Sequence, residues 1–421
     1  MLLHSSTVNF NIESKALDAT KVYDENEELV LNDIGKLSDI QTFFSLIRAY
    51  LVIGILVVPN GYFNGGWVFS NLCLLLSLLF TMGCSLLLLK ISEKYPGSYS
   101  ELGYLAFGAP GKFLCDLAIF ASQIGFTFPY FVYIWDNVNL ILVKFFEVSL
   151  DKWVICAVIF LIFTPLTWVK RIEWFIRWHI FADFLTIIVL GAIMVFGLIY
   201  YREEGFAGDV RPFNQDNYLV FIGTAVYMFE GTGLVLPMKN ASQNKNNLPK
   251  ILCIVLFFVF LLVCVFGTVN YLIYGDEVLS HTKLITQVLP DDSYTLLFIK
   301  VSFMICLTVT FPVAVYPPNM IIESYICKSD NVNDKPWSRN ISRTLLVLGI
   351  ITIACTFESG LDKLLSIVGS LTCTPVAFTL PAMMHLKLIA ETTFSKALDM
   401  FLILVSLTLL VGITGYNLSN W

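Results

Sequence analysis

Two apolar stretches of the 421-residue chain carry residues that could bind a small charged molecule inside a membrane. The first reads Gly54-Ile-Leu-Val-Val-Pro59, and the second reads Phe229-Glu230-Gly231-Thr232-Gly233-Leu-Val-Leu-Pro237. Glycine and proline interrupt a helix, and irregular backbone survives in a membrane only where it is buried in protein or lines a cavity. The free N–H groups and carbonyls of two broken helices would suit the carboxylate and the ammonium of a zwitterion.

We expect the substrate to contact both interruptions and two tyrosines that adjoin prolines. The predicted substrate-binding residues are Gly54, Ile55, Leu56, Tyr130, Phe229, Gly231, Thr232, Gly233 and Tyr316. Either interruption alone could serve only close packing or a kink, because Gly and Pro are common in membrane helices. The two at matched positions, one beside a carboxylate, favour a binding site.

Ionisable and hydroxyl side chains in the apolar stretches are the candidates for coupling to an ion. Glu230 is costly to bury, so it either binds and relays a proton or braces the broken helix as a permanently hydrogen-bonded carboxyl. Arg48 precedes the first interruption and is a candidate gate on the cytosolic side, or a partner of Asp183 or Glu230. Thr308 and Thr310 could coordinate a cation or return hydrogen bonds to their own helix.

Composition shows which elements must position these residues. Hydrophobic residues make up 57% of the chain and charged residues 14%, against about a quarter charged in a soluble domain. Eleven apolar segments are long enough to cross a bilayer, and lipid requires each to be a helix that satisfies its own backbone. They span 41–63, 66–91, 113–143, 152–169, 174–201, 217–239, 249–274, 294–326, 340–357, 361–388 and 395–417.

The fold class predicted is therefore an all-α integral membrane protein. The two interruptions lie five helices apart, as in a transporter built from two inverted five-helix repeats. We expect repeat one over 41–201, repeat two over 217–388 and an eleventh helix over 395–417. Residues 39–421 then form one transmembrane domain, preceded by an acidic tail, 1–38, that should be disordered and lacks the features of a signal peptide.

The distribution of Lys and Arg predicts the orientation of the chain. With the N-terminus in the cytosol, most basic residues of the connections face the cytosol, as the positive-inside rule requires. The opposite side receives only Lys144, Lys152, Arg202, Arg211, Lys283 and Lys363. The C-terminus is then lumenal or extracellular.

Metal, enzyme and channel chemistry find little support in the sequence. The ten Cys show neither CxxC nor Cys/His spacing, and His4, His179, His281 and His385 are scattered singly. We therefore expect no metal, no cofactor, no enzyme and no nucleic-acid partner, with a proton or a sodium ion as coupling ion. A channel would need a polar stripe along one helical face, which is not seen.

Several stretches resemble one known family, the amino acid/auxin permeases, and among them the vacuolar and the proton-coupled amino acid transporters. They are Gly54–Pro59 with Asn64-Gly65-Gly66, Ser122-Gln123-Ile124-Gly125-Phe126, Tyr99–Gly108, Phe221–Pro237, Tyr271–Gly275 and Leu364–Ser370. The likeness runs from about residue 40 to the C-terminus. It departs at Arg48–Ile53, where the family usually has a glycine- and asparagine-rich run, so the first helix should unwind less.

This resemblance implies eleven helices in a LeuT-type arrangement, with substrate held between helices one, three, six and eight. It also implies alternating-access transport of small neutral amino acids with protons, and it favours a vacuolar or lysosomal membrane over the plasma membrane. An alternative is an amino-acid sensor that uses the same pocket and signals through a cytosolic partner of the tail. In either case the partners are a small amino acid and the lipid bilayer.

Overall fold

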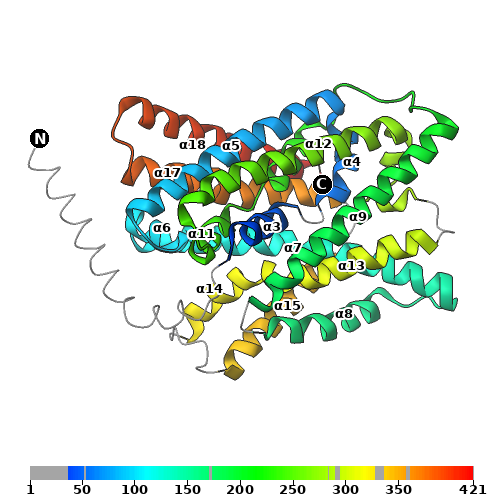
Figure 1. Ribbon diagram of the computed structural model, residues 1–421, viewed down its shortest axis with the longest axis horizontal. Helices are drawn as coiled ribbons and strands as arrows, with labels where there is room; N and C mark the ends of the chain where they lie inside the picture. Colours follow the sequence, from blue (N-terminus) through cyan, green and yellow to red (C-terminus); the bar gives the residue numbers. More distant parts are fainter. Residues whose placement is uncertain are drawn as a thin grey trace, which may run out of the picture.

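The computed structural model describes residues 37–51, 54–169, 173–282, 284–289, 294–327, 336–356 and 361–420, so nearly all of the predicted tail lies outside the described residues. The described elements are helices, joined by connections (Figure 1). Its elements are α3 (Asp39–Tyr50), α4 (Gly54–Gly65), α5 (Trp67–Lys94), α6 (Tyr99–Phe107), α7 (Ala109–Phe146), α8 (Lys152–Thr167), α9 (Glu173–Glu204), α10 (Tyr218–Met228), α11 (Thr232–Ala241), η1 (Lys245–Asn247), α12 (Leu248–Ser280), η2 (Ile285–Gln287), α13 (Tyr294–Ala314), α14 (Tyr316–Cys327), α15 (Pro336–Thr356), α16 (Leu361–Ile367), η3 (Val368–Cys373), η4 (Pro375–Thr379), α17 (Leu380–Leu388) and α18 (Thr393–Ser419).

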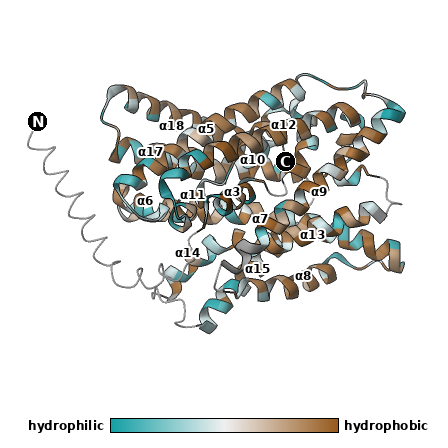
Figure 2. Cartoon of the chain, in the orientation of Figure 1, coloured by the Kyte–Doolittle hydropathy of each residue, from teal (hydrophilic) through white to brown (hydrophobic). Residues whose placement is uncertain are grey.

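The membrane-spanning helices match the predicted segments. Within the described ranges, nine helices are long and apolar enough to cross a bilayer, α3 and α4 together would make a tenth, and α8 is a shorter apolar helix. They correspond one for one to the eleven predicted segments. In Figure 2 the bodies of these helices are mainly hydrophobic, whereas many of their ends and connections are hydrophilic. The predicted all-α membrane fold is confirmed.

The two predicted interruptions are both present, but the first lies earlier than expected. The second falls at Phe229–Gly231, between α10 and α11. The first precedes Gly54, because α4 starts there and continues through Pro59. Pro237 likewise lies inside α11. Each proline removes one backbone hydrogen bond without ending its helix, since surrounding helices in a membrane protein can compensate for that loss.

The start of the first broken helix is hydrogen-bonded to the end of the second. Leu37 donates its N–H to the carbonyl of Ala241 at 2.8 Å and accepts from the N–H of Gln243 at 3.0 Å, a short parallel β-bridge. Nearby, Asn247 Nδ2 donates to Asp39 Oδ2 at 2.8 Å. The start of α3 is thus fixed to the connection that follows α11.

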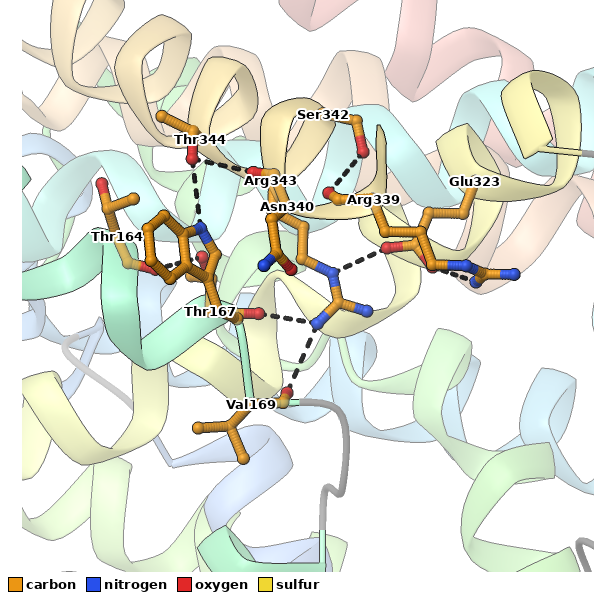
Figure 3. Close-up of polar contacts among 10 residues, drawn as sticks. Thr164, Thr167, Val169, Glu323, Arg339, Asn340, Ser342, Arg343 and Thr344 are labelled. Carbon is orange, nitrogen blue, oxygen red and sulfur yellow. Dashed lines mark hydrogen bonds and ion pairs between the residues drawn. The ribbon is translucent and has the colours of Figure 1, made fainter. Parts of the chain in front are cut away.

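A buried cluster of charges joins α8, α14 and α15 (Figure 3). Glu323 of α14 accepts from Arg339 Nη1 at 2.5 Å and from Arg343 Nε at 2.6 Å, both on α15. Arg343 also donates to the carbonyls of Thr167 and Val169 at the end of α8, at 2.7 and 3.4 Å. We call Glu323, Arg339 and Arg343 the charge brace. None of its residues lines the cavity described next.

Candidate functional site

A cavity of about 480 Å³, including its open mouth, lies between α3, α7, α9, α11 and α13. The part of it that water-sized molecules can occupy is about 40 Å³, which is room for a few water molecules. It is lined by Ser45, Arg48, Ala49, Gln123, Phe126, Tyr130, His179, Glu230, Gly231, Leu234, Met238, Thr310, Val313 and Ala314. These come from five helices that are far apart in the sequence, and the second interruption forms part of the wall.

The two broken helices interlock at their interruptions. A β-carbon at Gly54 would lie 2.5 Å from Met228 Sδ, and one at Gly231 would lie 2.6 Å from Tyr50 Cε1. Each glycine therefore packs against the other broken helix, in contacts too close for a larger side chain. Substrate bound at one interruption is accordingly next to the other.

The two carboxylate oxygens of Glu230 have different surroundings. Its Oε1 accepts from the N–H of Gly233 at 3.4 Å, which braces the first turn of α11 as an N-terminal capping group does. Its Oε2 is buried and accepts no hydrogen bond from any described residue. The side chain is 1% exposed and lines the cavity, so one oxygen supports the helix while the other is available to a ligand or a proton.

The guanidinium of Arg48, on α3, donates to residues of two other helices, α9 and α13. Nε and Nη2 donate to Thr310 Oγ1 at 2.8 and 2.5 Å, and Nη2 also donates to the carbonyl of Cys306 at 3.0 Å. Nη1 donates to Thr186 Oγ1 at 3.0 Å and lies 3.6 Å from Asp183 Oδ1. Of the two candidate partners, the structure places Asp183 beside Arg48. The contact joins α3 to α9 and α13.

The structure brings only part of the predicted site together. Arg48, Tyr130, Glu230 and Gly231 line the cavity, whereas the other predicted residues do not. Those others are Gly54, Ile55, Leu56, Phe229, Thr232, Gly233 and Tyr316, with Asp183 and Thr308 of the coupling set. Most of them are buried in the helix contacts around the cavity. Thr308 donates to the carbonyl of Met304 at 2.8 Å, as a hydroxyl returning a hydrogen bond to its own helix does.

Three lining residues carry polar groups that the sequence reasoning did not assign to the site. Gln123 lies one turn before Phe126 on α7. In the sequence, this stretch served only as evidence for the family resemblance. His179 is one of four isolated histidines in the sequence, and Ser45 is not among the predicted site residues, although the family resemblance matches it to a position where proton-coupled members often have a histidine. No spacing signal links them, because each lies on a different helix. In the described parts of the chain, no group of three or more His, Cys, Asp and Glu could hold a metal.

Comparison with known families decides what kind of protein this is. The family "Transmembrane amino acid transporter protein" matches residues 35–418, nearly the whole chain. The chain belongs to this family. The resemblance predicted from the sequence is confirmed, and the chain is a multi-pass membrane protein.

Individual relatives of this family member are transporters of fungi and plants. Vacuolar amino acid transporter 3 of Schizosaccharomyces pombe is 30% identical over 87% of this chain, and the protein of that name in Saccharomyces cerevisiae is 28% identical over 94%. The chain spans 56% and 59% of their lengths, respectively. Amino acid transporter ANT1 of Arabidopsis thaliana is 27% identical, and the match covers 88% of this chain and 90% of the relative.

A solved structure shows the fold of this family member. A Na⁺-coupled sialic acid symporter, in a substrate-bound outward-open state, matches with a TM-score of 0.56 at 11% identity. The match covers 96% of this chain and 97% of the symporter. The predicted LeuT-type fold is confirmed by this likeness, which at such low identity speaks for the fold alone.

Proposed function

We propose that this chain is a secondary active carrier of small neutral amino acids, driven by protons and working by alternating access. Family membership and relatives named as amino acid transporters support the transport of amino acids. The single observation that carries the proposal is Glu230. It lies at the break of a membrane helix, lines the cavity, and has one carboxylate oxygen with no partner among the described residues.

A proton is the better-supported coupling ion. Hard cations such as sodium take oxygen ligands, and the hydroxyls of α13 were the sequence-based candidates to supply them. Thr308 donates its hydroxyl hydrogen to its own helix, and the Thr310 hydroxyl accepts from Arg48. The Thr310 oxygen is therefore engaged within the protein and Thr308 does not line the cavity, whereas Glu230 lines it and its Oε2 is available to take up a proton.

The membrane proposed is that of the vacuole or lysosome, with the N-terminus in the cytosol. Relatives named as vacuolar amino acid transporters support the compartment. Such compartments are acidic, so a proton gradient would drive amino acids outward. The cavity would then face the cytosol, because it lies near the joined end of α3 and α11, where the predicted tail is attached.

The test is uptake of labelled amino acids into proteoliposomes under an imposed pH gradient. Wild-type protein is compared with Glu230→Gln and with Glu277→Gln, a matched control at an exposed carboxylate outside the cavity. We expect the pH gradient to drive uptake by the wild type and by the Glu277→Gln control. Glu230→Gln should exchange amino acid across the membrane without responding to the gradient. Equal responses of all three proteins would exclude Glu230 from the proton path.

Failure of transport would point to the alternative function. If no amino acid moves, but one raises the melting temperature of the purified protein, an amino-acid sensor becomes the better account. The attachment of Leu37 to the connection after α11 is the feature that would carry a signal between tail and cavity.

A further inference from the structure

His179 is a buried polar group without a partner in the described structure. It lies on α9 with 3% of its surface exposed, and it lines the cavity. Neither ring nitrogen makes a hydrogen bond with a described residue. Leaving a buried polar group unsatisfied costs about 1–3 kcal/mol, so native proteins rarely tolerate it without a ligand or water. His179 lines the cavity, so a ligand or water in the cavity can supply this partner.

Two charged residues, Arg48 and Glu230, also line the cavity, and their hydrogen-bond partners differ from those of His179. The Arg48 guanidinium is occupied by Thr310, Thr186, the Cys306 carbonyl and the nearby Asp183 carboxylate. Glu230 has one oxygen without a partner, at the helix break. A ligand therefore meets a carboxylate oxygen at the break before α11 and an imidazole on α9, both without a described hydrogen-bond partner, on different walls of one cavity.

We propose that His179 determines substrate specificity by hydrogen bonding to the substrate side chain. This inference rests on the proposed function and names its substrate class: neutral amino acids whose side chains end in a hydrogen-bonding group, such as glutamine. The α-ammonium binds at Glu230 beside the break, and the side chain extends toward α9. A neutral imidazole has one donor and one acceptor nitrogen, and an amide offers both complements.

Two other substrate classes fit the cavity less well. An aliphatic side chain would leave the imidazole buried without a hydrogen bond, and sites built to hydrogen-bond their substrate reject analogues that lack the group. An acidic side chain would need a cation with donors to spare. Arg48 is the lining cation, and its guanidinium already contacts Thr310 and Asp183.

The experiment compares uptake of glutamine and methionine, which are similar in length and size, by proteoliposomes of the full chain. Wild type should prefer glutamine by about ten-fold, the value of one good hydrogen bond. His179→Leu should reduce the preference to within about two-fold, mainly by losing glutamine uptake, whereas His179→Gln should keep most of it. His281→Leu, at an exposed histidine outside the cavity, should match wild type.

Binding and transport are read separately so that two kinds of failure can be told apart. Thermal stabilisation of the purified protein by glutamine over methionine, lost in His179→Leu, would support the inference even if no transport occurs. Equal loss of both substrates in His179→Leu would overturn it, as would a wild type that prefers methionine. If the wild type prefers methionine but its uptake is driven by protons, the proposed function still holds and only the role of His179 is wrong.

Discussion

At Gly231 the absence of a side chain lets two broken helices approach. Its backbone φ is −165°, an extended value that any residue adopts, so a substitution there is limited by contact rather than by conformation. The ring of Tyr50 occupies the space that a β-carbon would take. Gly233 lies two residues later. A β-carbon there would lie 3.6 Å from Gln123 Nε2, an ordinary van der Waals contact.

We therefore expect Gly231→Ala to reduce uptake by at least about ten-fold, since misplacing binding groups by 1 Å can cost about 100-fold. Gly233→Ala is the matched control and should keep near-normal uptake. Adding Tyr50→Leu to Gly231→Ala should restore part of the activity by making room. If Gly231→Ala transports like wild type, the contact between the two interruptions is not required.

The contact between Arg48 and Asp183 is a second residue-scale feature. Both side chains are almost fully buried, 2% and 4% exposed, and removing one partner of such a pair strands the other charge. Arg48→Met should lower the free energy of unfolding by about 3–5 kcal/mol. The measurement is thermal unfolding of the purified protein in detergent, with and without a second change.

The double variant Arg48→Met/Asp183→Leu tests whether pairing is the cause. It should recover most of the lost stability, because neither charge is then left alone in an apolar setting. Losses that simply add in the double variant would show that the two residues act independently.

At the scale of elements, the charge brace joins helices that do not line the cavity. Glu323, Arg339 and Arg343 bind α8, α14 and α15 to one another, whereas the cavity is lined by α3, α7, α9, α11 and α13. The bridge from Leu37 instead joins α3 to the segment after α11. If transport proceeds by the alternating access proposed above, we expect α3 and α11 to move together and α8 and α15 to stay joined.

Glu323→Gln tests this division of labour. The change removes the buried anion that Arg339 and Arg343 both contact, so we expect a loss of about 3–5 kcal/mol in stability. The KM for amino acid should change by less than about two-fold, because the brace does not touch the cavity. Thermal unfolding and uptake kinetics measure the two effects. A raised KM with unchanged stability would contradict the assignment.

At the scale of the whole molecule, the proposed orientation can be read from the two faces of the membrane. Lys94, at the end of α5, should face the cytosol, and Gly208, in the connection after α9, should face the lumen. Both positions are exposed, and a side chain at Gly208 would meet open space. Lys94→Cys should react with a membrane-impermeant maleimide on intact vacuoles, and Gly208→Cys only after permeabilisation. The reverse pattern would invert the topology.

The sequence could predict the helices and the family because both signals are local. Hydropathy over about 20 residues depends on composition alone, and the residues at Phe221–Pro237 stand together in the chain. The position of the first break was harder to predict from the sequence. Gly54 and Pro59 marked it, yet α4 contains both, because neighbouring helices rather than propensity decide where a membrane helix ends.

Only the tertiary structure decided which polar groups share the cavity. Arg48 and Thr310 are 262 residues apart, and Arg48 and Thr186 are 138 apart. Gln123 joins them from α7 and His179 from α9, without any sequence signal. The sequence of a helix does not show which of its faces lines a cavity, because that depends on how the helix packs against its neighbours. The sequence therefore determined the membrane fold and its glutamate at the break, whereas helix packing determined what surrounds that glutamate.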